Sequence, residues 1–193
     1  MRLHGYVNNL LFIENIYDPG EDSKRRFSFR LKRRRWFHRP RFPQHNDIVV
    51  SMITAFDPST GYLPPGVHDV AWAVVVSEFG SNAHRLGLLN GLLEALRNLA
   101  GAGCRWVLLD GSFVSRTALP KDYDGAWEPA GVDPARLDPV SLDFSNGRAA
   151  MKARYGGELF PLAAAGILYR DFFQQDRNGV RKGVVQIGLG SLP

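Results

Sequence analysis

The chain has 193 residues, of which 45% are hydrophobic and 11% aromatic, and this composition excludes wholesale disorder and predicts one domain. The net charge of +5 is local, because residues 1–51 carry eleven Lys or Arg against five acids, whereas residues 52–193 carry thirteen against fourteen. No apolar run approaches the ~20 residues of a membrane span, and the single cysteine, Cys104, is typical of a reducing compartment. We therefore expect a cytoplasmic protein without membrane contact.

Basic and aromatic residues alternate in the segment from Lys24 to Phe42. Three interpretations stay open for it. Residues 24–42 could contact a nucleic acid, since such side chains bind phosphates and stack on bases. They could instead form a solvated tail, or translation could start at Met52, where the composition changes abruptly. The predicted organisation is a basic N-terminal extension, residues 1–51, and one domain, residues 52–193.

Hydrophobic periodicity and turn residues predict the elements of residues 52–193 in chain order. The first expected helix starts near Asp69 and ends at Gly80, and the clearest helix is Arg85–Ala100, with leucines at three- and four-residue steps. The later expected elements are strands at 104–110, 122–127 and 140–145, helices at 148–157 and 159–174, and a turn and strand over 177–189. This order predicts an α/β (α+β) fold, with a small mixed sheet flanked by helices.

Paired aspartates follow the buried strand that ends at Asp110. Gly111-Ser112 is separated by nine residues from Asp122-Tyr123-Asp124. Side chains at i and i+2 of a strand share a face, so Asp122 and Asp124 should project together and repel each other unless a cation lies between them. Mg²⁺ prefers carboxylate oxygens, and two such ions support an in-line displacement at phosphorus. The spacing therefore predicts a two-ion magnesium site.

Gly111 and Ser112 provide the complementary phosphate contacts. Glycine lets the backbone approach a ligand, and the Ser112 hydroxyl and the following N–H groups can bind phosphate oxygens. A third carboxylate is expected from Asp143, between the apolar residues of "SLDFS", with Asp138 as its rival. Arg148 and Lys152, four residues apart on an expected helix, could both reach a triphosphate or form a solvated basic face.

Other polar residues have simpler interpretations. Asp133 and Asp138 precede prolines and are typical of turns, and Asp143 could cap the turn before Asn146. His68 has no second ligand at metal-site spacing, so a helix-entry or surface position is favoured. Cys104 is expected to be a small core residue.

The stretch "LDGSFVSRTALPKDYDG" resembles the signature of the DNA polymerase β-like nucleotidyltransferase superfamily: hydrophobic-Gly-Ser, about a dozen residues, Asp-hydrophobic-Asp, and a third Asp on a later strand. Residues 52–193 also resemble small bacterial proteins predicted to be nucleotidyltransferases, through "YLPPGVH", "DYDG" and "LDFSNGRAAMKARYGGELFP". There are two departures. Gly125 replaces the usual apolar residue after the second Asp, and Asp143 follows Asp124 by only nineteen residues.

The resemblance implies a Mg²⁺-dependent nucleotidyltransferase that moves an NMP from an NTP, such as ATP, to a protein, RNA or small-molecule hydroxyl. It implies catalytic and metal roles for Asp122, Asp124 and Asp143, nucleotide binding by Gly111 and Ser112, and a place in a toxin–antitoxin or defence module. The alternative is a catalytically inactive nucleotide-binding or antitoxin-like module with the same fold, and a third hypothesis is nucleic-acid binding through residues 24–42.

Overall fold

The computed structural model describes residues 10–15, 29–34, 53, 55–164 and 167–193. Most of the N-terminal extension, including residues 24–28 and 35–42, lies outside the described residues, and so does the Met52 at which we placed a possible start. The nucleic-acid contact and the alternative start therefore stay predictions.

A five-stranded mixed sheet forms the centre of the domain, in the order β3-β9-β4-β5-β6. β4 runs antiparallel to both of its neighbours, whereas β3 is parallel to β9 and β5 is parallel to β6. The bounds are β3 (Gly66–Val70), β4 (Trp106–Asp110), β5 (Asp124–Trp127), β6 (Glu158–Pro161) and β9 (Gly183–Gly188). The predicted α+β class with a small mixed sheet is confirmed.

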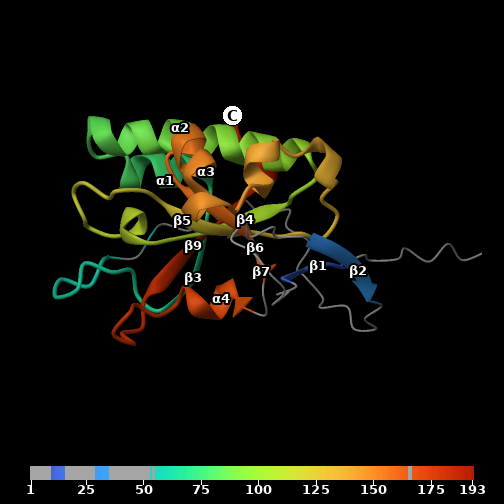
Figure 1. The fold of residues 1–193 in the computed structure, drawn as a ribbon. Coiled ribbons are helices and arrows are strands. Elements are labelled where there is room, and N and C mark those ends of the chain that lie inside the picture. Colours follow the sequence, from blue (N-terminus) through green and yellow to red (C-terminus); the bar gives the residue numbers. More distant parts are fainter. Residues whose placement is uncertain (1–9, 16–28, 35–52, 54, 165–166) are drawn as a thin grey trace, which may run out of the picture.

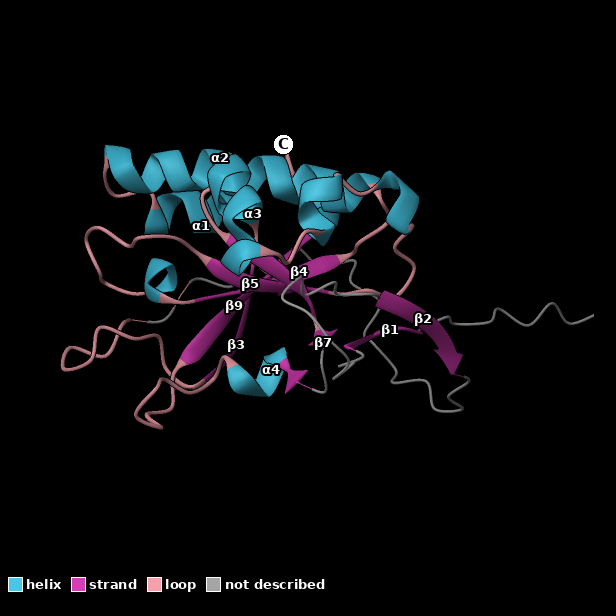
Figure 2. Ribbon diagram, in the orientation of Figure 1, coloured by secondary structure: helices cyan, strands magenta, loops and turns pink. Residues whose placement is uncertain are grey.

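Helices cover both faces of this sheet. α1 (Trp72–Phe79), α2 (Ala83–Gly101) and α3 (Ala149–Tyr155) lie on one side, and the single turn of α4 (Tyr169–Phe172) lies on the other (Figures 1 and 2). The leucine stripe of α2 belongs to the larger core, and a smaller cluster of Leu108, Ala126, Phe173 and Val184 fills the side of α4. Cys104 is buried, as expected. None of the helices in the described ranges is long and apolar enough to cross a membrane.

A second sheet, in the order β2-β1-β7-β8, was not predicted. β1 is antiparallel to β2, and β1 is parallel to β7 through Ile13 and Ala164. Its strands are β1 (Leu10–Asn15), β2 (Phe29–Arg34), β7 (Ala163–Ala164) and β8 (Ile167–Leu168). β2 is the described part of the 24–42 segment.

The predicted strand at 140–145 is wrong. Residues Pro139–Leu142 form a 3₁₀ helix instead. Asp138 starts this turn, because its side chain accepts a hydrogen bond from the Val140 N–H. Proline after this cap has a fixed φ suited to the first helical position, so the local turn chemistry overrides the apolar pattern.

The predicted helix at 159–174 is also wrong over most of its length. Glu158–Pro161 pairs in parallel register with Asp124–Trp127, and only Tyr169–Phe172 is α-helical. Apolar runs fit a buried strand as well as a buried helix, and here pairing with β5 decides between them. Gly66–Val70 likewise pairs with β9, so the first helix begins at Trp72 rather than near Asp69.

Candidate functional site

Three carboxylate side chains form a row across β4, β5 and β6. Asp110 is paired with Asp124, and Asp124 is paired with Glu158. Residues directly opposite each other on neighbouring strands point to the same face of a sheet. All three line one cavity, together with Asp122. The sheet register thus brings together Asp110, Asp124 and Glu158 from three different strands.

Basic side chains compensate the two ends of this row. Lys182 Nζ lies 2.5 Å from Asp110 Oδ1, and both side chains are about nine-tenths buried. Burial still raises the pKa of Asp110, while Lys182 opposes that rise. At the other end, the Arg148 guanidinium forms an ion pair with Glu158, which is 5% exposed. Each end of the row therefore carries a paired charge.

Asp124, at the centre of the row, retains a proton near neutrality. Burial raises its pKa to about 7, and the hydrogen bond to Glu158 and the charges of Glu158, Asp122 and Asp110 act in the same direction. The hydrogen bond to Glu158 thus favours the protonated form of Asp124. A bound cation could replace the proton, because a positive charge stabilises both ionised groups.

Asp122 lies just before β5 and is held from α3. Lys152 Nζ is 2.9 Å from Asp122 Oδ2 and 3.7 Å from Glu158 Oε2. The hydrogen bond to Asp122 raises the pKa of Lys152, so its ammonium stays charged. A cationic side chain thus already lies between two of the carboxylates.

Gly111 brings the backbone close to the row. Its φ of +82° is in the region that favours glycine, and a Cβ atom there would lie 2.7 Å from Asp124 Oδ2. A larger residue would therefore press on the central carboxyl group. The group that the Gly111 backbone approaches is Asp124, and its approach to a phosphate stays a prediction.

The loop after Gly111 is fixed by hydrogen bonds. Ser112, Ser115 and Thr117 line the cavity, and Ser115 Oγ donates to the Ser112 carbonyl at 2.7 Å. Arg85, which is 2% exposed, donates to the carbonyl oxygens of Phe113 and Thr117 from behind the loop. The Ser112–Val114 3₁₀ helix thus has a well-defined position.

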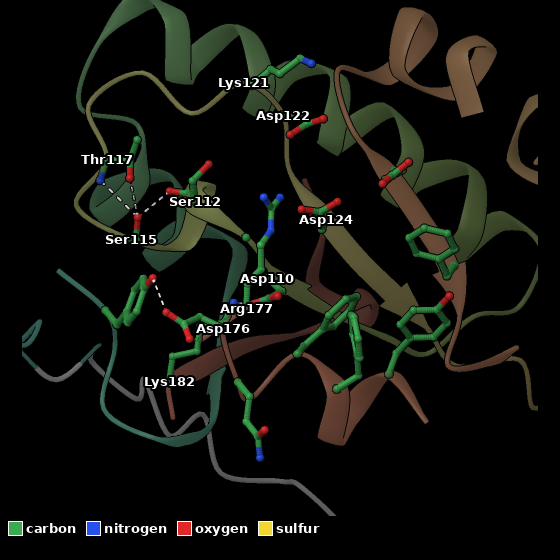
Figure 3. Close-up of a pocket in the computed structure, with 18 of the residues that line it drawn as sticks. Asp110, Ser112, Ser115, Thr117, Lys121, Asp122, Asp124, Asp176, Arg177 and Lys182 are labelled. Atoms are coloured by element: carbon green, nitrogen blue, oxygen red, sulfur yellow. Dashed lines mark hydrogen bonds and ion pairs between the residues drawn. The ribbon is translucent and has the colours of Figure 1, made fainter. Parts of the chain in front are cut away.

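The cavity has a volume of about 1220 Å³ and joins these groups to α4 and the hairpin that follows it. Figure 3 shows Ser112, Asp122 and Asp124 on one side of it, with Asp176 and Lys182 across from them. This volume exceeds the usual 300–1,000 Å³ of a small-ligand pocket.

The structure brings six of the seven predicted site residues together. Gly111, Ser112, Asp122, Asp124 and Arg148 line the cavity, and Lys152 reaches Asp122 from α3. Asp143 does not join them. It is outside the cavity lining, and its Oδ1 accepts hydrogen bonds from the N–H and hydroxyl of Ser145, which lower its pKa. Its rival, Asp138, accepts a hydrogen bond from the Tyr155 hydroxyl.

Sequence reasoning missed Asp110, Glu158 and Lys182. Asp110 directly precedes the Gly-Ser pair, but it was taken only as the end of a strand. Glu158 was overlooked because it lies between the two predicted helices, 148–157 and 159–174, where no strand was expected. A parallel β6 would have placed it opposite Asp124.

Gly125, the departure from the superfamily pattern, has a packing reason. A Cβ atom there would lie 2.5 Å from the Leu108 carbonyl oxygen and 2.6 Å from Leu159 Cδ2. Leu159, which is paired with Gly125 on β6, occupies the space that an apolar residue would take.

No group of three or more His, Cys, Asp or Glu residues has metal-binding geometry within the described ranges. The oxygen donors nevertheless suit Mg²⁺ chemically. The ammonium group of Lys152 would have to leave Asp122 before that carboxylate could bind an ion.

A model of the family described as "Family of unknown function (DUF6932)" matches residues 54–188. The chain belongs to this family. The DUF6932 match spans the segment from before β3 to the end of β9, and it includes the carboxylate row, the Gly111 loop and Lys182. Neither the curated proteins nor the solved structures gave a match to the chain.

Proposed function

We propose that this DUF6932 protein is a Mg²⁺-dependent nucleotidyltransferase that acts in the cytoplasm. The observation that carries the proposal is the row of carboxylates from Asp110 to Glu158, which lies beside Gly111 and Ser112 in one cavity. Carboxylates that hold divalent cations next to a phosphate-binding loop are what phosphoryl and nucleotidyl transfer require.

In this proposal Asp122, Asp124 and Glu158 hold the metal, and Glu158 takes the place that we had assigned to Asp143. When bound, Mg²⁺ would neutralise the triphosphate and stabilise the charge that develops on it. Glu158 suits this position because it is buried and paired with Asp124, whereas Asp143 accepts from Ser145 outside the cavity.

The cationic side chains have a second function in this proposal. Arg148 and Lys152 neutralise Glu158 and Asp122 in the described conformation. When a metal-bound NTP enters, both side chains would exchange the carboxylates for phosphate oxygens. Gly111 and Ser112 would contact the β- and γ-phosphates, as expected from the sequence.

The transfer is a displacement at the α-phosphorus of the NTP. The hydroxyl oxygen of the acceptor forms a bond to the α-phosphorus, the bond to the bridging oxygen breaks, and pyrophosphate leaves. The acceptor proton passes to a carboxylate of the site. The acceptor class remains that expected from the sequence: a hydroxyl group of a protein, an RNA or a small molecule.

A second candidate function is nucleotide binding without turnover. The position of Lys152 favours it, because its ammonium already lies between Asp122 and Glu158, where a metal ion would otherwise be needed. In that case nucleotide binding would not require Mg²⁺, and Lys152 would be a permanent structural cation.

Calorimetric titration of the full chain with each of the four NTPs, with and without Mg²⁺, separates these functions. The nucleotidyltransferase proposal expects binding that requires Mg²⁺ and is lost in the double variant Asp122→Asn, Asp124→Asn. Glu78→Gln, at an exposed position of α1, is the matched control. Binding that is equally strong without Mg²⁺ would favour the non-catalytic module, and no binding of any NTP to the folded protein would overturn both.

A further inference from the structure

The cavity has a second wall, opposite the carboxylates and the Gly111 loop (Figure 3). It consists of α4 and the hairpin that joins α4 to β9, and it contributes Phe172 and Arg177 to the lining. α4 lies on the opposite side of the sheet from α2 (Figure 1).

The Phe172 side chain is 61% exposed, in contrast to that of the next residue. The adjacent Phe173 is 4% exposed and packs in the smaller core with Leu108 and Val184. Tyr169 stacks on Phe160 with ring centroids 4.9 Å apart, and it meets Phe172 edge-on at 6.0 Å. Phe173 and Tyr169 thus fix α4 to the sheet, and the Phe172 ring is left at the cavity with exposed surface.

Arg177 is presented by a turn that is held at several points. Asp176 Oδ1 accepts hydrogen bonds from the N–H groups of Asn178 and Val180, and Asp176 Oδ2 accepts one from the Tyr62 hydroxyl. The position of Arg177 at the centre of this turn is therefore well defined. Figure 3 shows its side chain in the cavity, between Asp176 and Asp124.

The charge of Arg177 is not compensated. Arg148 and Lys182, two other cations of the lining, form ion pairs with Glu158 and Asp110. Arg177 has no hydrogen-bond or ion-pair partner among the residues that the structure describes. A guanidinium group binds phosphate through two parallel hydrogen bonds, and an exposed phenyl ring in a pocket stacks on a planar base.

We propose that α4 and the following hairpin form the nucleoside subsite of the cavity, in which Phe172 stacks on the base and Arg177 binds a phosphate. This inference rests on the proposed function, because it assigns parts of the same NTP. Stacking is tolerant of base identity but stronger for larger rings, so purine NTPs should bind more tightly than pyrimidine NTPs.

Titration of ATP and of inorganic tripolyphosphate, both with Mg²⁺, tests the two residues separately. Phe172→Ala should weaken ATP binding about tenfold and leave tripolyphosphate binding unchanged. Arg177→Gln should weaken the binding of both ligands about tenfold. The matched controls are Leu168→Ala, an exposed apolar residue next to α4, and Arg181→Gln on the same hairpin, neither of which lines the cavity. Both controls should stay within twofold of the wild type.

Failure of this inference is distinguishable from failure of the proposed function. If the wild type binds Mg²⁺-ATP but Phe172→Ala and Arg177→Gln behave like their controls, the nucleoside subsite is refuted and the function stands. A loss of tripolyphosphate binding in Phe172→Ala would also refute it, because the effect would then not concern the base. If the folded wild type binds neither ligand, both proposals fall.

Discussion

Asp124 and Glu158 occupy paired positions on the parallel strands β5 and β6, and their carboxyl groups hydrogen-bond to each other. They are 34 positions apart in the sequence, and only the pairing of β5 with β6 brings them together. This pair links the fold to the proposed chemistry. The register between β5 and β6 places two carboxyl groups side by side and contributes to the raised pKa of Asp124.

The stability of the protein should depend on pH through Asp124. Its pKa rises from 3.8 in the unfolded chain to about 7 in the folded one, because of burial and the hydrogen bond to Glu158. Protonated Asp124 therefore stabilises the folded state. This contribution is fully present below the pKa of the unfolded chain and is lost as the pH rises through about 7. Between pH 4 and pH 8 the free energy of unfolding should therefore fall by about 2–4 kcal/mol from this group.

Urea denaturation of the wild type and of Asp124→Asn at pH 5 and pH 8 measures this effect. The free energy of unfolding of Asp124→Asn should not fall between pH 5 and pH 8, so the variant should be more stable than the wild type at pH 8. Asp133→Asn, at an exposed turn, is the control and should follow the wild type. Parallel curves for the wild type and Asp124→Asn would show that Asp124 is ionised throughout.

Lys152 should compete with a divalent cation. Its ammonium lies 2.9 Å from Asp122, so Lys152→Gln removes a positive charge from the group of carboxylates that would bind the ion. We expect the variant to bind Mn²⁺ severalfold more tightly than the wild type in the absence of nucleotide, as measured by electron paramagnetic resonance.

The control for Lys152 is Arg154→Gln on the same helix, which pairs with the exposed Glu94 and does not line the cavity. It should leave Mn²⁺ affinity unchanged. An unchanged affinity in Lys152→Gln as well would mean that the ammonium group does not compete with the metal.

Gly111→Ala should weaken NTP binding, whereas the same change at another glycine with positive φ should not. Gly111 and Gly131 have almost the same φ, +82° and +85°, but only at Gly111 would a Cβ atom meet another group, Asp124 Oδ2. Backbone strain should cost both variants about 1 kcal/mol of stability. Only Gly111→Ala should also weaken NTP binding, and similar NTP affinities in the two variants would refute a special role for the Gly111 approach.

Arg85 should stabilise both the domain and the loop beside the cavity. It is buried, and it donates to the carbonyl oxygens of Phe79, Phe113 and Thr117. Arg85→Met leaves these oxygens without their donor, so we expect a loss of about 2–4 kcal/mol in thermal or urea denaturation. Arg116→Met, an exposed arginine over Phe56, should change stability by less than about 1 kcal/mol. Equal losses in both variants would contradict this account.

The sequence was most informative where the pattern was local. Leucine periodicity predicted α2, and an apolar run predicted β4. Gly111-Ser112 and the paired aspartates, which their spacing singled out, line one cavity.

The remaining elements depend on contacts between distant segments. Residues 159–161 of β6 were placed in a predicted helix, because only their pairing with β5 identifies them as a strand. Glu158, just before that helix, was missed for the same reason. Asp143 was expected on a strand, but the cap that Asp138 provides turns residues 139–142 into a 3₁₀ helix. The ion pairs of Lys152 and Lys182 with the carboxylates could not be predicted, because they depend on how α3 and β9 pack against β4 and β5.

The central claim is that the carboxylates of β5 and β6 hold a divalent cation together with an NTP. A crystal of the full chain grown with Mn²⁺ and a non-hydrolysable NTP, measured at the manganese absorption edge, tests it most directly. We predict an anomalous difference peak bonded to carboxylate oxygens of Asp122, Asp124 and Glu158, with Lys152 moved onto a phosphate. A nucleotide bound in the cavity without such a peak, and with Lys152 still on Asp122, would contradict the claim.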